Sequence, residues 1–428
     1  MLNLSVPYGK SEKQFSLPDE LEINYISANP LTPITDFKEY ILRKLENPTG
    51  SKPFKEIFKK GEKVAIVVSD VTRLWVRSYD FLPILIDELN MLGIPDNDIS
   101  IVMSTGDHRE QSKEEHRLIV GEEVLGRIKI FDHDCFADDL VFLGVTSRGT
   151  NVYFNRQVHE ADKVIITGGI CYHLLAGFGG GRKSLAPGIT GYDTIQENHG
   201  LAIKAEPGQI GTGILIGNPV AEDMDEAAAM TNADFLLNVV VNEKKEFIGI
   251  VAGHWRDAHL EGTKIVEKAF GIPIAKKADV VIASSGGYPK DIQLYQSIKT
   301  LDNAYYAAKD GGSIILVSEC SDGPGPESYL SWFKYDNYDV MAKALYEGFT
   351  MPGFVALRTA EILLDKTVYL VSSLEQEVVE RVGMKPVSSV DEALKIINEK
   401  QHQKKQQINS VHIMPHGAIT YPIQMSEV

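Results

Sequence analysis

Short apolar runs alternate with longer amphipathic stretches along this chain. The runs are rich in Val and Ile and have the length of single strands, which predicts buried β-strands. Strands that alternate with helices indicate an α/β fold with mostly parallel sheets. The predicted strands are Lys63–Ser69, Ile99–Ser104, Lys163–Thr167, Asp279–Ser284 and Ser313–Ser318, and the predicted helices include Pro83–Met91, Ala258–Phe270 and Asp391–Lys400.

The length of the chain and one break in this pattern predict two domains. A chain of 428 residues is longer than a single hydrophobic core usually supports. A helical stretch ends near Gly271-Ile272-Pro273, and a new strand follows it. We therefore expect one domain over residues 1–270 and a second domain over residues 271–428.

Polar or glycine-rich turns follow most of the predicted strands. In open α/β sheets, ligands bind beyond the carboxyl ends of the strands. These turns are therefore where we look for a functional site. They contain Asp70-Val71-Thr72-Arg73, Gly106-Asp107-His108-Arg109, Gly168-Gly169 and Ser285-Gly286-Gly287.

Composition and charge exclude several classes of protein. The net charge of −16 argues against a general nucleic-acid binder, which needs a basic face. Cys135, Cys171 and Cys320 are widely spaced and form neither a disulfide framework nor a thiolate metal site. This favours a reducing, cytoplasmic setting. We see no signal-peptide pattern and no apolar run of about 18 residues, so no membrane span is expected.

The segment Cys171–Gly200 is the richest in candidate chemistry. Gly177 precedes Lys183-Ser184 at the spacing of a phosphate-binding P-loop, but Arg182 stands where a P-loop needs glycine. Pro187-Gly188 also disfavours the helix that should begin there. Lys183 could pair with a phosphate. Equally, a lysine among glycines and an arginine could have a lowered pKa and act as a nucleophile or covalent anchor.

Three histidines in turns are candidates for specific roles. His108 and His173 both follow predicted strands, and two histidines beside one ligand make an acid/base pair near neutral pH. His199 lies farther along the chain and could bind a metal ion. The chain has no HExxH helix, which argues against a zinc protease of that type.

Two cationic groups could bind an anion. Arg73 has the planar fork that suits a carboxylate or a phosphate. If the segment that contains Tyr295, Gln296 and Lys299 is helical, Tyr295 and Lys299 lie on one face. An ordinary amphipathic helix with an exposed lysine would explain the same pattern.

Four blocks together resemble the nickel-dependent lactate racemase family, whose members racemise or epimerise 2-hydroxy acids. The resemblance extends over most of the chain and is most specific between His173 and His199. The blocks are Asp70–Arg73, Gly106–Arg109, His173–His199, and Gly286–Pro289 with its continuation to Lys299.

The resemblance implies a nickel-pincer nucleotide, which is a pyridinium mononucleotide with two sulfur-containing arms. It would be attached through a thioamide to Lys183, and its nickel would be ligated by His199. His108 and His173 match the catalytic acid/base pair. The other implied cofactor-binding residues are Asp70, Thr72, Gly180, Gly181 and Arg182, and the implied substrate-binding residues are Arg73, Tyr295, Gln296 and Lys299.

The resemblance also implies roles for the two domains. Residues 1–270 would bind the cofactor, residues 271–428 would contribute substrate-binding residues, and the active site would lie in the cleft between them. The partners would be a small 2-hydroxy acid and the enzymes that make the cofactor. A homo-oligomer is a further possibility.

The implied chemistry avoids a costly carbanion. Loss of a hydride from Cα of a 2-hydroxy acid gives a stable 2-keto acid, whereas loss of a proton leaves a carbanion beside a carboxylate. The cofactor would carry the hydride, and one histidine on each side would handle the hydroxyl proton. Reorientation of the keto acid would then allow return of the hydride to the other face.

Two alternatives and one departure from the family pattern remain open. A nicotinamide-dependent dehydrogenase would need a GxGxxG turn after a strand, and none of the predicted strands is followed by this motif. A non-catalytic nickel-nucleotide binding protein would not need two acid/base histidines. The stretch Gly353–Ile362 apparently matches a segment that holds a substrate-side tryptophan in the lactate enzyme. It contains no tryptophan here, and Trp332 is distant along the chain, so the substrate could be another 2-hydroxy acid.

Overall fold

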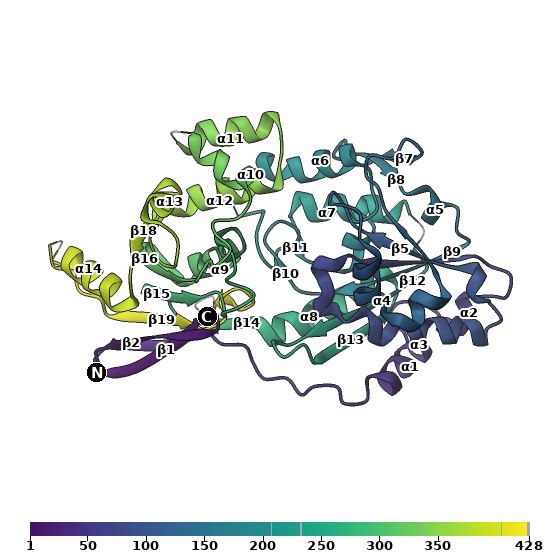
Figure 1. The fold of residues 1–428 in the computed structure, drawn as a ribbon, viewed down its shortest axis with the longest axis horizontal. Coiled ribbons are helices and arrows are strands. Elements are labelled where there is room, and N and C mark those ends of the chain that lie inside the picture. The colour runs from purple at the N-terminus through teal and green to yellow at the C-terminus, as the bar shows by residue number, and fades with distance from the viewer. Residues whose placement is uncertain (207, 232, 336, 404, 426–428) are drawn as a thin grey trace. The chain divides into compact units, whose positions relative to one another are not determined.

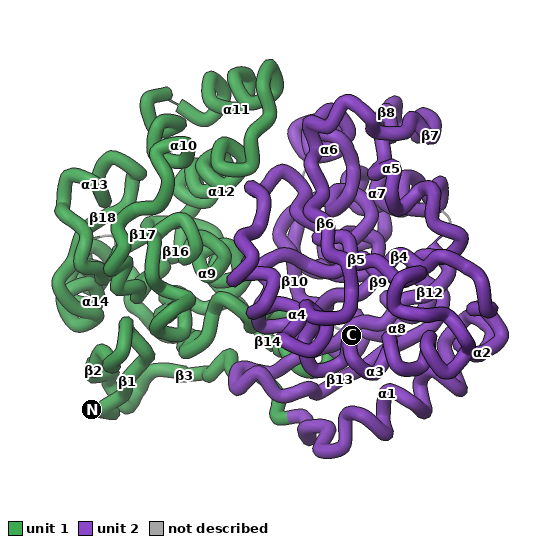
Figure 2. The backbone as a smooth tube through the Cα atoms, turned by 45° about the vertical axis from the view of Figure 1, so that its right-hand side comes forward, with its two compact units in different colours: residues 1–30, 268–428 green, residues 31–267 purple. Residues whose placement is uncertain are grey.

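The computed structural model describes residues 1–206, 208–231, 233–335, 337–403 and 405–425. The chain divides into two compact units (Figure 2), one of residues 31–267 and one that combines residues 1–30 with residues 268–428. Both units contain a mostly parallel sheet with helices, which confirms the predicted α/β class.

The unit of residues 31–267 is built on a six-stranded sheet in which all neighbouring pairs are parallel except β12 and β13. In sheet order the strands are β13 (Phe247–Gly253), β12 (Phe235–Val241), β9 (Lys163–Gly169), β4 (Val64–Ser69), β5 (Ile99–Ser104) and β6 (Lys129–Asp132). Two small hairpins accompany the sheet, β7–β8 (Val141–Val145, Asn151–Phe154) and β10–β11 (Tyr172–His173, Gly177–Phe178).

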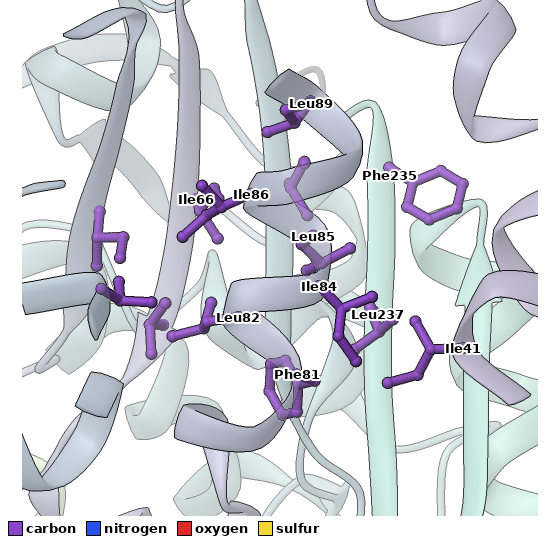
Figure 3. Close-up of a cluster of buried hydrophobic side chains, with 14 of the residues drawn as sticks. Ile41, Ile66, Phe81, Leu82, Ile84, Leu85, Ile86, Leu89, Phe235 and Leu237 are labelled. Atoms are coloured by element: carbon purple, nitrogen blue, oxygen red, sulfur yellow. The ribbon is translucent and has the colours of Figure 1, made fainter. Parts of the chain in front are cut away.

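Helix α3 (Ser78–Met91) buries one face against the sheet of this unit. In Figure 3, Phe81, Leu82 and Leu85 of α3 lie over the strands that carry Ile66 and Leu237, and all five side chains are fully buried. The helices are α1 (Phe37–Glu46), α2 (Phe54–Ile57), α3 (Ser78–Met91), α4 (Lys113–Arg127), α5 (Arg156–His159), α6 (Tyr192–Gly200), α7 (Pro219–Ala229) and α8 (Trp255–Phe270), with short 3-10 turns η1 (Val71–Val76), η3 (Gly181–Ser184) and η4 (Leu201–Lys204).

The second unit has a fully parallel six-stranded sheet. In sheet order its strands are β18 (Lys385–Val387), β17 (Thr367–Val371), β16 (Ala308–Val317), β15 (Ala278–Ser284), β19 (Ser410–Met414) and β3 (Glu22–Tyr25). Its other strands are the hairpin β1–β2 (Leu2–Tyr8, Ser11–Leu17) and the pair β14–β20 (Gly271–Ile274, Tyr421–Gln424). Its helices, most of them labelled in Figure 1, are α9 (Leu294–Ala307), α10 (Glu327–Leu330), α11 (Tyr338–Glu347), α12 (Met351–Asp365), α13 (Gln376–Arg381) and α14 (Val390–Gln403).

The five predicted strands are all present as β4, β5, β9, β15 and β16, and the three predicted helices fall within α3, α8 and α14. The predicted boundary near Gly271 lies close to the division at residue 268. The placement of residues 1–30 differs from the expected domain of residues 1–270, because these residues belong to the C-terminal unit. Phe15 and Leu17 are buried in that unit's core, and β3 pairs with β19.

None of the helices in the part of the chain that the structure describes is long and apolar enough to cross a membrane.

Phe235 provides a test of the core in the unit of residues 31–267. Its ring is fully buried, with its centroid 5.1 Å from that of Phe54 and 6.4 Å from that of Phe58. We expect Phe235→Ala to lower the free energy of unfolding by about 3–5 kcal/mol, because it leaves a cavity between these rings. Urea unfolding followed by tryptophan fluorescence measures this. Met91→Ala, at a side chain that is 71% exposed, should change it by less than about 0.5 kcal/mol.

Candidate active site

Asp70 and His108 form a carboxylate–histidine pair at the ends of β4 and β5. His108 Nδ1 lies 2.5 Å from Asp70 Oδ2, and the carboxylate is 3% exposed. The nitrogen that faces the carboxylate carries the proton, which leaves Nε2 as the atom that can accept one. The hydrogen bond to Asp70 raises the pKa of His108, and the same pairing lowers the pKa of Asp70. Asp70 therefore fixes the orientation and the tautomer of His108.

The same carboxylate is linked to Arg73. Thr72 Oγ1 donates to Asp70 Oδ1 at 2.5 Å, and Arg73 donates to Thr72 Oγ1 at 3.0 Å. The 3-10 turn η1, which begins directly after Asp70, places these three side chains in a row. Asp70 and Thr72, predicted to bind the cofactor, thus connect the predicted base His108 with the predicted anion-binding residue Arg73.

Two buried polar side chains clamp the glycine-rich turn that precedes Lys183. Gly181 has a φ of +54°, and a Cβ atom there would lie 2.5 Å from the ring of His259. Its N–H donates to Asn238 Oδ1 at 2.7 Å. His259 Nε2–H donates to the carbonyl of Gly179 at 3.0 Å. Only a residue without a side chain fits between these partners.

Arg182 is held inside the protein rather than facing an open site. Its side chain is 2% exposed, lies 3.1 Å from Asp225 Oδ1 and donates to the carbonyl of Ala176. Gly180, Gly181 and Arg182 were predicted to bind the cofactor. In the structure their described contacts position the turn that presents Lys183. This turn is the short 3-10 helix η3, so the α-helix of a P-loop does not begin here, as the sequence indicates.

Lys183 is partly buried, and its surroundings change the pKa of its amine. Burial, followed by the positive charges of Arg73 and Arg182, lowers the pKa of Lys183 to about 7. Its Nζ lies 3.2 Å from His173 Nε2. A large fraction of the amine is therefore neutral near pH 7, as a nucleophile or covalent anchor requires.

His173 and His199 lie in different environments around this lysine. His173 Nδ1 accepts the N–H groups of Leu175 and Ala176, each at 3.2 Å. His199 on α6 is 4% exposed, and its Nδ1–H donates to the carbonyl of Ile195 at 2.9 Å. Burial and the charge of Lys183 lower the pKa of His199 to about 3.

These properties of His199 suit a metal ligand. A histidine ligand must be neutral, and the hydrogen bond of one ring nitrogen fixes the other as the donor to the metal. Nδ1 of His199 holds the proton, so Nε2 has the lone pair. No group of three or more His, Cys, Asp and Glu side chains that could bind a metal ion occurs among the described residues.

The other predicted substrate residues lie on α9 of the C-terminal unit. The segment is helical, and Lys299 Nζ donates to Gln296 Oε1 at 3.1 Å. The ring of Tyr295 packs against Tyr329 with centroids 5.3 Å apart. Lys299 is exposed and Tyr295 is partly buried.

Trp332 lies against Gly353 despite their separation in the sequence. A Cβ atom on Gly353 would be 2.5 Å from Trp332 Cε2. The stretch Gly353–Ile362 on α12 has no tryptophan of its own, but an indole from η5 (Ser331–Lys334) packs directly on its first residue. Trp332 therefore contacts this stretch although it lies far from it along the chain.

Three residues that position the lysine turn were not predicted from the sequence: Asn238, His259 and Asp225. One signal was available, because Asn238 interrupts the apolar run FLLNVVV of β12. A buried polar residue in such a run needs a hydrogen-bond partner. His259 and Asp225 lie in helices and have no pattern around them that indicates their partners.

The Asp70–His108 pair predicts the effect of removing one charge. In Asp70→Asn the pKa of His108 should fall, because its largest raising contribution is lost. NMR titration of His108 measures this pKa. Asp107→Asn should lower it less, since Asp107 acts only through a weaker charge effect. An equal pKa of His108 in the wild type and in Asp70→Asn would contradict the pairing.

The raised pKa of His108 also makes the stability of the fold depend on pH. The stabilisation from the charged His108 ring is present below about pH 6.5 and is lost as pH rises through the folded pKa.

The environment of Lys183 predicts early titration. Competitive acetylation with mass spectrometry should give a midpoint near pH 7 for Lys183 in the folded, unmodified chain. In the urea-unfolded chain the midpoint should be about 10.4. Arg73→Gln should raise the folded midpoint, because one of the opposing positive charges is removed. A folded midpoint equal to the unfolded one would mean that Lys183 is an ordinary lysine.

Comparison with known proteins places the chain in a family. A lactate racemase N-terminal domain model matches residues 8–211, and a lactate racemase C-terminal domain model matches residues 274–420. The lactate racemase of Thermoanaerobacterium thermosaccharolyticum is 36% identical over 92% of this chain and 94% of that protein. The lactate racemase of Lactiplantibacillus plantarum is 31% identical over 97% of this chain and 99% of that protein.

The fold matches as well. The structure of the lactate racemase apoprotein from Thermoanaerobacterium thermosaccharolyticum has a TM-score of 0.88 with this chain, at 33% identity, and covers 99% of this chain and 100% of that chain. With both domain models and two full-length relatives matched, the resemblance seen in the sequence is confirmed: this chain belongs to the lactate racemase family.

Proposed function

We propose that the chain racemises or epimerises a small 2-hydroxy acid, with lactate as the first substrate to test. Its cofactor would be a nickel-pincer nucleotide attached to Lys183 and ligated by His199. The observation that carries this proposal is the environment of Lys183. A neutral amine beside His173, under the electrostatic influence of two arginines, suits covalent attachment of an anionic nucleotide.

His108 and His173 would act as the acid/base groups of the reaction. When held by Lys183 and His199, the cofactor would supply hydride-transfer chemistry for Cα of the substrate. His108 Nε2 would take the hydroxyl proton, because Asp70 holds the proton on Nδ1 and stabilises the imidazolium that forms. His173 would do the same for the other enantiomer. Two bases that approach from opposite sides are what a reaction between mirror images needs.

Cationic side chains would hold the substrate carboxylate. Arg73, steadied by its hydrogen bond to Thr72, would bind it from the unit of residues 31–267. We propose that Tyr295, Gln296 and Lys299 of the C-terminal unit complete the set of substrate-binding residues. The need for cofactor-making enzymes, the cytoplasmic setting and a homo-oligomer stay predictions.

The proposal is tested by producing the chain together with the cofactor-making enzymes. The intact mass should exceed the mass of the sequence, and Lys183→Ala should abolish the excess. The loaded protein should convert pure L-lactate or pure D-lactate to an equal mixture of the two. Chiral chromatography measures this conversion. His108→Ala should reduce the rate by at least about 100-fold and keep the nickel, because general acid/base catalysis typically contributes that much. His199→Ala should lose the nickel.

His116→Ala is the matched control for His108→Ala. His116 also pairs with a carboxylate, with its Nε2 2.9 Å from Asp132 Oδ1, but it is not a predicted site residue. Its substitution should leave racemisation unchanged. An unmodified Lys183 would contradict the cofactor assignment. A mass excess without racemisation of lactate or of a panel of other single-enantiomer 2-hydroxy acids would favour a nucleotide-binding protein without turnover.

A further inference from the structure

The proton of His173 is placed by the backbone. Nδ1 accepts two hydrogen bonds, from the N–H groups of Leu175 and Ala176, both at 3.2 Å. A ring nitrogen that accepts an N–H carries no proton itself. The proton of the neutral ring is therefore on Nε2. In this state Nε2 can donate a hydrogen bond, but it cannot take a proton from a substrate.

Nε2 faces the amine of Lys183. The two nitrogens are 3.2 Å apart. An ammonium group has three donors and no acceptor, so Nε2–H can donate to Lys183 only when the amine is neutral. Burial of the amine, followed by the positive charges of Arg73 and Arg182, favours that state and outweighs the opposite effect of Cys171 and Asp107. In the unmodified chain the hydrogen bond runs from His173 to Lys183.

We propose that acylation of Lys183 reverses this hydrogen bond and thereby converts His173 Nε2 into a base. On acylation Nζ bonds to the acyl or thioacyl carbon, the C–O bond of the acid group breaks, and the oxygen leaves as water with one proton from the amine and one from the acid. The Nζ lone pair is then delocalised into the C=O or C=S bond, and the remaining N–H is a donor.

The reversed bond requires a change in the ring. Nε2 can accept the new N–H only if the proton moves to Nδ1, which must then leave the N–H groups of Leu175 and Ala176. Nε2 has no lone pair in the unmodified chain, whereas after modification it would have one, which could take a substrate proton once the single N–H of Lys183 is displaced. His108 has no such link, since its proton is fixed by Asp70. The inference rests on the proposed function, in which Lys183 is the attachment point.

The test compares the unmodified chain with a chain that has Nε-acetyl-lysine incorporated at position 183. The acetyl group supplies the same N–H donor without any cofactor. Nitrogen-15 NMR of labelled histidine reports which ring nitrogen carries the proton, and His173→Gln identifies the His173 signals. We expect an excess of the Nε2–H form in the unmodified chain and an excess of the Nδ1–H form in the acetylated chain. The His108 signals should stay unchanged in both.

Two variants with natural amino acids at position 183 form a matched pair that tests the inference without acetyl-lysine. Lys183→Arg supplies donors and no acceptor, so it should also favour Nδ1–H. Lys183→Met supplies neither, so His173 should keep the Nε2–H form that the backbone favours. Equal thermal unfolding midpoints show that the variants fold alike.

The same His173 form in the acetyl-lysine, arginine and methionine chains would overturn the inference. Because no sample contains the nucleotide, this result would leave the cofactor assignment intact. That assignment fails separately, by the absence of a mass excess on Lys183.

Discussion

The candidate site depends on keeping one amine neutral among positive charges. Removing Lys183 from water and placing it under the influence of Arg73 and Arg182 costs free energy whenever the amine is protonated. A flexible lysine would escape this cost by turning toward solvent. The clamp by Asn238 and His259, and the burial of Arg182 against Asp225, oppose that movement. The lowered pKa of the amine therefore depends on the rigidity of the turn that holds it.

The two predicted acid/base histidines are not equivalent, although sequence reasoning treats them alike. His108 has a carboxylate behind it, which stabilises the charged ring. His173 has two backbone N–H groups behind it, which stabilise the neutral ring. A histidine backed by N–H donors is a poor base until those donors are released. In the proposed reaction, the two histidines would therefore differ in basicity.

Much of the fold could be predicted because parallel strands buried on both faces are continuous apolar runs. β4, β5, β9, β15 and β16 have this pattern, and the turns after them contain Asp70, His108 and His173. The partners of these residues could not be predicted. Asn238 and Asp225 act through hydrogen bonds or ion pairs with residues far away in the sequence. Such contacts leave no periodic pattern in a single sequence. The contact of Trp332 with Gly353 was missed for the same reason.

The pairing of β3 with β19 has a consequence for the order of folding. β3 (Glu22–Tyr25) precedes the unit of residues 31–267 in the sequence, whereas its partner β19 (Ser410–Met414) follows that unit. Residues 31–267 have their own core and all six strands of their sheet, so they can fold while the ribosome is still adding the rest. The hairpin β1–β2 and strand β3 must wait, with Phe15 and Leu17 exposed, until the strands they pack on exist. Residues 1–30 are therefore made before residues 31–267, yet they reach their native contacts only after β19 has been made.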